Sequence, residues 1–167
     1  NDYTFFQDSL MHRIFSLKTK WKPGGEYRVS LDSLASVSIY GNPSNRLSQS
    51  FKVKTVEEYS NFYIETLGIK DSAFVELLNS SDQPVRKSPV KDGGAEFIYV
   101  DPGTYYIRLV KDRNGNGKFD TGNFAEKRQP EEVFYYPTSI DLKANWDVEQ
   151  TWDVYALPLD KQKPLDI

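Results

Sequence analysis

The chain has 167 residues and a net charge of −3, with 21 basic and 24 acidic side chains. This length admits one domain, or one domain and part of a second, and the acidic balance argues against a nucleic-acid binder, whose binding face is basic. No apolar run is long enough to cross a bilayer, and the lack of cysteine excludes disulfides, thiolate zinc sites and cysteine nucleophiles.

The first third of the chain contains too few strands for a closed sandwich. Four short segments alternate between apolar and polar residues with the two-residue period of a β-strand. They cover residues 3–6, 13–20, 26–32 and 47–54. Three or four strands cannot close two layers, so we expect residues 1–56 to be the C-terminal part of a larger β domain.

A complete β unit is predicted for residues 57–157. Eight short segments of strand character follow one another, separated by turns rich in Gly, Pro, Asn and Asp. They cover residues 62–67, 74–78, 85–90, 95–100, 105–110, 132–136, 140–144 and 146–155. This spacing is typical of an antiparallel β-sandwich. Residues 158–167, with two prolines and several charges, have the composition of a tail.

Two local signals constrain how these strands are connected. The Asp-Gly-Gly run at residues 92–94 predicts a tight hairpin between the strands on either side. Pro89 has no N–H for a central ladder, so the strand at residues 85–90 is expected at a sheet edge.

Residues 20–54 resemble a known module. The sequence has a Pro-Gly-Gly turn with a tyrosine-bearing strand at residues 23–29, Ile-Tyr-Gly at 39–41 and Phe-Lys-Val at 51–53. This order resembles the closing strands of the bacterial Ig-like domain found in surface-layer and other cell-surface proteins. The resemblance implies that residues 1–56 are the end of such a domain.

A second resemblance covers the following unit. An Ala-Glu-Phe strand at residues 95–97, followed by an Asp-Pro-Gly turn and a tyrosine-bearing strand at 101–108, resembles transthyretin-like and collagen-adhesin B-type sandwiches. The extension at residues 112–124 resembles a variant in exported bacterial proteins that carry the Ig-like domain. The resemblance implies an exported protein at the cell surface, in the periplasm, or in the outer membrane as a lipoprotein whose lipid anchor lies outside this chain.

The most distinctive stretch is the Asp- and Asn-rich run at residues 112–120. It matches the first nine positions of the calcium-loop pattern, with a glycine where the backbone turns sharply. The candidate ligands are Asp112, Asn114, Asn116 and Asp120 by their side chains, and Lys118 by its backbone carbonyl. The twelfth position is Asn123, where the pattern requires a bidentate glutamate, so a calcium ion would bind weakly, with millimolar-class affinity.

A metal-free turn explains the same residues. Asn and Asp side chains bond to backbone N–H groups two residues ahead, and Asn-Gly pairs supply positive φ at low cost. Under this interpretation the run at residues 112–120 is a self-capped connection between strands. Both interpretations predict positive φ at Gly117.

No combination of residues in the sequence predicts catalysis. The adjacent pairs Glu131-Glu132 and Glu57-Glu58 point to opposite faces of a strand, so we interpret them as solvated edge charges. The single histidine, His12, has no nucleophile motif beside it and is expected at the surface. We therefore expect a chain that is not an enzyme.

Aromatic rings offer the best material for binding. Aromatic residues make up 14% of the chain, and the rings considered are Trp146, Trp152, Tyr135, Tyr136, Tyr99 and Tyr106. Either Trp146 and Trp152 fill the core, or exposed rings contact a protein or carbohydrate partner. The sequence therefore predicts a non-catalytic spacer or adhesion-like unit, with a carbohydrate-binding module as the alternative.

Overall fold

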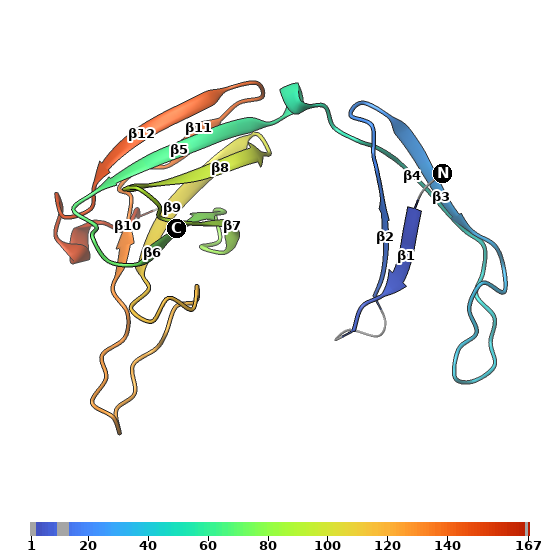
Figure 1. The fold of residues 1–167 in the computed structure, drawn as a ribbon, viewed down its shortest axis with the longest axis horizontal. Coiled ribbons are helices and arrows are strands. Elements are labelled where there is room, and N and C mark those ends of the chain that lie inside the picture. The colour runs from blue at the N-terminus through green and yellow to red at the C-terminus, as the bar shows by residue number, and fades with distance from the viewer. Residues whose placement is uncertain (1–2, 10–13, 166) are drawn as a thin grey trace. The chain divides into compact units, whose positions relative to one another are not determined.

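The computed structural model describes residues 3–9, 14–165 and 167 (Figure 1). His12 lies outside these residues. The described chain contains twelve strands and two short 3-10 turns, with no α-helix, which confirms the all-β class. Within the same residues no helix has the length and apolar character to span a membrane. The chain divides into two compact units, Asn1–Thr55 and Val56–Ile167.

The first unit consists of two separate antiparallel hairpins. Strand β1 (Tyr3–Gln7) pairs with β2 (Phe15–Thr19), and β3 (Glu26–Leu31) pairs with β4 (Leu47–Lys52). None of the described side chains in this unit is buried. An isolated two-stranded hairpin is marginally stable in water, so this unit lacks the layer that would give it a core.

An aromatic cluster is the main contact within the second hairpin. Trp21 packs edge-on against Tyr27 and Phe51, with ring centroids 4.8 and 5.3 Å away. The opposite face is polar, where the Arg28 side chain donates to the Ser50 hydroxyl over 3.2 Å. The hairpin is therefore amphipathic, as the alternation in the sequence predicts.

The second unit contains two sheets. The larger sheet has the order β10-β9-β6-β7, with β11 also paired to β9, and all of its pairs are antiparallel. Its strands are β6 (Ala73–Leu78), β7 (Pro84–Pro89), β9 (Gly103–Lys111), β10 (Val133–Tyr135) and β11 (Ile140–Leu142). The position of β7 at the end of this order confirms the edge predicted from Pro89.

The smaller sheet has the order β12-β5-β8. Strand β5 (Ser60–Leu67) is antiparallel to β8 (Gly94–Val100) but parallel to β12 (Asp147–Asp153). The expectation of purely antiparallel pairing is therefore wrong for β12. Its partner β5 lies more than eighty residues earlier in the chain, and such a distant pairing leaves no local signal.

The hairpin predicted at residues 92–94 is also wrong in part. The tight turn forms, with positive φ at Asp92 and Gly93 and with Lys91 and Gly94 exchanging backbone hydrogen bonds of 2.8 and 3.0 Å. However, β7 and β8 on either side belong to different sheets. The turn is a local event, whereas each strand joins the sheet in which its apolar face is buried.

Both sheets bury their inner faces in one hydrophobic core. In β5 the buried residues Phe62 and Ile64 alternate with exposed ones, the pattern of a sheet with one covered face. The core side chains from the two sheets are Phe62, Ile64, Ala95, Phe97, Val100 and Trp152 on one side and Ala73, Val75, Leu77, Ile107, Leu109, Phe134, Ile140 and Leu142 on the other. Each fully buried large side chain contributes roughly 1.5–3 kcal/mol.

The C-terminal segment is held against this unit by one buried side chain. Gln162 is only 3% exposed. Its amide nitrogen donates to the carbonyls of Val154 and Leu157, over 3.0 and 2.8 Å, and its oxygen accepts the N–H of Tyr135. Residues predicted as a tail therefore include an anchor beside the edge strand β10.

Two fragments test where the stability lies. Because the buried core belongs to residues 56–167, we expect this fragment to unfold cooperatively on its own, and residues 1–55 to show no cooperative transition. Denaturant unfolding followed by circular dichroism and tryptophan fluorescence measures both. A non-cooperative melt of the 56–167 fragment would contradict the assignment.

Candidate functional site

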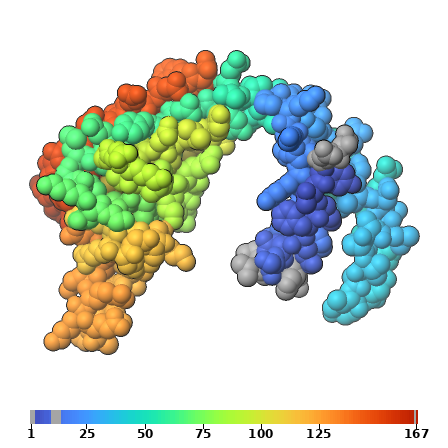
Figure 2. Space-filling model, in the orientation of Figure 1, coloured from blue at the N-terminus to red at the C-terminus, as the bar shows by residue number. Residues whose placement is uncertain are grey.

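The loop between β9 and β10, residues 112–132, contains the sequence-predicted site. Figures 1 and 2 show it extending away from the two sheets of its unit. Its base is closed by β9 and β10 and by Lys111, whose backbone N–H donates to the Glu132 carbonyl over 3.0 Å. The side chains of Lys111 and Glu132 also form an ion pair of 2.8 Å. Their hydrogen bond raises the pKa of Lys111 and lowers that of Glu132.

Asp112 anchors the start of the loop from a buried position. Its side chain is only 4% exposed, and its two carboxylate oxygens accept the backbone N–H groups of Asn116 and Gly117 over 3.0 and 2.7 Å. The φ of Gly117 is 70°, which confirms the predicted positive value. The carboxylate therefore acts as an internal cap for a turn that needs glycine.

The remaining predicted ligands converge on one another. The side-chain amides of Asn114 and Asn116 both donate to the same oxygen of Asp120, over 2.5 and 3.0 Å. The amide oxygen of Asn114 accepts the N–H of Asn116, and that of Asn116 accepts the N–H of Lys118. Asp112, Asn114, Asn116 and Asp120 are thus linked in one network, which Lys118 enters through its N–H.

Glu131 is a member of this site that the sequence reasoning missed. The interpretation of Glu131 as a solvated edge charge is wrong, because it is only 7% exposed. Its two carboxylate oxygens accept the backbone N–H groups of Arg113 and Asp120, over 2.8 and 3.0 Å. It ties both arms of the loop together. Its neighbour Glu132 looks the same in sequence, so no local signal separates the two.

The polar side chains of the loop bond mainly to the loop's own backbone N–H groups. Every carboxylate and amide oxygen named above already accepts an N–H. Across residues 3–9, 14–165 and 167, no three His, Cys, Asp or Glu side chains are grouped to hold a metal ion. Weak calcium binding by Asp112, Asn114, Asn116, Lys118 and Asp120 stays a prediction of the sequence pattern.

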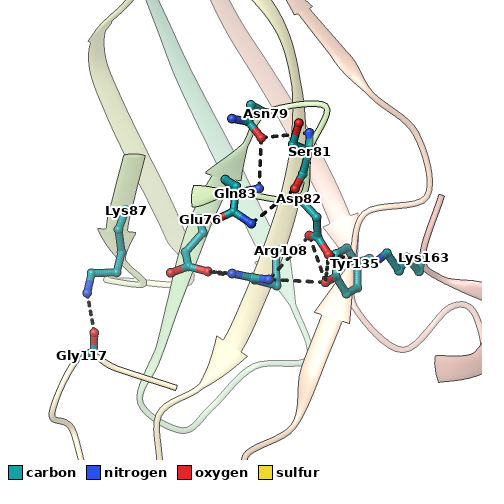
Figure 3. A network of polar contacts seen from close by, with 10 residues as sticks. All are labelled: Glu76, Asn79, Ser81, Asp82, Gln83, Lys87, Arg108, Gly117, Tyr135 and Lys163. Carbon is teal, nitrogen blue, oxygen red and sulfur yellow. Dashed lines mark hydrogen bonds and ion pairs between the residues drawn. The ribbon is translucent and has the colours of Figure 1, made fainter. Parts of the chain in front are cut away.

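A lysine connects the loop to the outer side of the larger sheet. Lys87 on β7 donates to the Gly117 carbonyl (Figure 3). The Lys87 ammonium also lies 5.0 Å from the ring centroid of buried Phe74. The loop is therefore held at its glycine turn as well as at its base.

A second polar network lies on the same sheet around Arg108. Its guanidinium donates to one oxygen of Glu76 over 2.9 and 2.7 Å, and it faces Asp82 and the Tyr135 hydroxyl on its other side (Figure 3). Burial lowers the pKa of Arg108, but the hydrogen bonds with Tyr135 and Glu76 outweigh this and raise it. Lys163 completes the group with a 2.8 Å ion pair to Asp82. The network joins β6, β9, β10 and the C-terminal segment.

The aromatic residues divide into structural and exposed rings. Trp152 is 4% exposed and packs edge-on against Tyr136, with centroids 5.6 Å apart, and Tyr106 is also buried. Trp146 and Tyr99 are 49% and 47% exposed. Trp146 lies before β12 starts, so the two tryptophans do not share one environment. Only the exposed rings are available to a partner.

Comparison with known proteins identifies no family. No family model matches the chain, and no curated protein matches it. These comparisons therefore lend no support to the Ig-like and transthyretin-like resemblances.

The neighbouring glutamates provide a matched test of the scaffold. Glu131→Gln replaces one of the two carboxylate oxygens that accept part-buried backbone N–H groups with a donor, so we expect a loss of about 1–3 kcal/mol in unfolding free energy. Glu132→Gln removes a partly exposed ion pair and should cost less than about 1 kcal/mol. Urea unfolding of both variants measures the difference, and equal losses would contradict the role of Glu131.

Calcium distinguishes the two interpretations of the loop. Because most of the predicted ligand oxygens already accept N–H groups, we expect the same melting temperature in millimolar calcium and in chelator. Calcium at one hundred times its Kd would instead add about 2.7 kcal/mol. A calcium-dependent rise in wild type that Asp112→Asn abolishes would establish a cation site.

Proposed function

We propose that the chain is a non-catalytic β-sandwich module of an exported or cell-surface bacterial protein, acting as a structural spacer or adhesion-like binding unit. Two sheets that share one core support the sandwich assignment. The resemblance of residues 20–54 and 95–108 to Ig-like and transthyretin-like modules supports the bacterial surface setting. In this proposal residues 1–56 belong to a larger Ig-like domain.

The proposal that the chain is not an enzyme rests on how its buried charged side chains are bonded. A catalytic carboxylate or base needs an open position from which it reaches a substrate. Here the buried carboxylates Asp112 and Glu131 accept backbone N–H groups, and Arg108 is held by Glu76. Among the described residues no buried side-chain nitrogen or oxygen lacks a hydrogen-bond partner. These groups are used to hold the fold.

A carbohydrate-binding module is the alternative, and the exposed rings favour it. Trp146 and Tyr99 are each about half exposed, and flat rings of this kind stack on sugar faces. Lys143 lies over the Trp146 ring at 4.8 Å, and this contact accounts for part of the ring surface without a sugar. The spacer is therefore the main proposal.

Affinity electrophoresis in gels that contain soluble polysaccharides tests both functions. We expect the chain to migrate at the same rate with and without polysaccharide, and to release no reducing ends from any of them. Phe124, a fully exposed ring on the loop, provides the control. If polysaccharide slows the wild-type chain and Phe124→Ala but not Trp146→Ala, the carbohydrate-binding module is favoured. Release of reducing ends would overturn the non-catalytic assignment.

A further inference from the structure

The outward edge of β12 presents backbone groups that have no partner. In the parallel register with β5, the Asn61 N–H donates to the Trp146 carbonyl and the Val154 N–H to the Leu67 carbonyl. Even-numbered residues of β12 therefore bond to β5, and the odd-numbered ones point their N–H and C=O groups outward. Within the described chain, nothing bonds the outward backbone groups of Asp147, Glu149 and Thr151.

Three other strand edges of this unit, those of β8, β10 and β7, carry a block. On β8, Arg86 donates to the Tyr99 carbonyl over 2.7 Å, and on β10 Gln162 accepts the Tyr135 N–H. Strand β7 begins and ends in proline, which cannot donate to a new strand. Proteins normally block an exposed strand edge because it pairs with other chains. The outward edge of β12 has no comparable block among the described residues of this unit.

A small apolar pocket lies beside this edge. Its volume is about 140 Å³, and its lining includes Thr151, Trp152 and Asp153 of β12 together with Tyr136 and Pro137. An apolar cavity of roughly 150 Å³ accepts a guest the size of benzene. A strand that pairs with β12 turns alternate side chains toward this inner side, so the pocket has room for one aliphatic side chain.

The charges on the outer face select the partner. Asp147, Glu149 and Asp153 are exposed there, next to Glu65 on β5, and none of these carboxylates forms an ion pair within the described residues. A second copy of the chain would bring the same negative charges against them, and like charges opposite one another destabilise a strand pair. A segment with Lys or Arg at alternate positions is complementary.

We propose that the outward edge of β12 binds an extended basic segment of another protein, which adds to the three-stranded sheet as a fourth strand. Main-chain hydrogen bonds to residues 147–151 hold the segment in register. Its basic side chains face the carboxylates, and an aliphatic side chain enters the pocket. This inference rests on the proposed function, because it names a partner class for a non-catalytic binding unit.

Fluorescence anisotropy with a labelled peptide tests whether the outward edge of β12 binds a basic strand. The probe is the heptapeptide Lys-Val-Lys-Val-Lys-Thr-Lys, capped at both ends, titrated with the full 167-residue chain. Its matched control carries the same charges but is N-methylated at every backbone nitrogen, so neither edge of the peptide can donate to a strand. We expect saturable binding of the probe, weakened by salt, and at least tenfold weaker binding of the methylated control. Equal binding of the two peptides would overturn strand addition.

Variants of the chain distinguish the contribution of backbone hydrogen bonds to probe binding from the contribution of charge. We expect Thr151→Pro, which removes an outward N–H but no backbone bond to β5, to weaken probe binding about tenfold. Thr151→Val is the control, because it keeps the N–H and, like proline, loses the side-chain hydrogen bond from Thr151 to Glu65. Glu149→Lys should weaken binding by a similar factor, whereas Asp160→Lys makes the same charge change away from the edge and should leave it within about twofold. Circular dichroism confirms that each variant is folded.

Two further results would overturn the proposal. Sedimentation of the wild-type chain as a dimer that Thr151→Pro dissociates would assign the edge to a second copy. Absence of probe binding would rule out strand addition at β12. It would not change the polysaccharide and reducing-end results, so the proposed function is tested separately.

Discussion

The structure of residues 56–167 depends on one constraint: the apolar inner faces of two sheets have to be buried against each other. Phe62 and Phe97 from the smaller sheet stack with ring centroids 6.0 Å apart, and the same core contains Val75, Leu77 and Leu109 from the larger sheet. This burial decides which sheet each strand joins. It explains why strands that are neighbours in sequence, such as β7 and β8, are separated by a tight turn yet lie in different sheets.

The polar groups of this unit serve the same purpose. A charge removed from water is costly unless it is bonded, and the unit places Asp112, Glu131 and Arg108 where donors or acceptors already exist. The result is a long loop and a C-terminal segment that are fixed to the sheets through hydrogen bonds. Such fixation agrees with the role proposed above, that of a spacer or binding unit.

The sequence predicts what is local and misses what is distant. The alternation of Phe62 and Ile64 with exposed residues reveals a strand with one buried face, and the Asn-Gly pairs reveal a turn with positive φ at Gly117. The parallel partner of β12 could not be predicted, since pairing is settled by packing between remote segments. Glu131 and Glu132 are chemically identical neighbours, and only the folded loop buries one of them. Trp146 and Trp152 differ in the same way, because β12 begins between them.

The Gln162 side chain has a consequence for the integrity of the protein. It occupies a hydrogen-bonding position at the margin of β10 that an incoming strand would otherwise use. Proteolytic cleavage before Gln162 would remove no core side chain. It would, however, expose the edge of β10 as a second unblocked strand edge in this unit. Gln162 thus blocks this edge, and its removal would leave the Tyr135 N–H open to strand pairing.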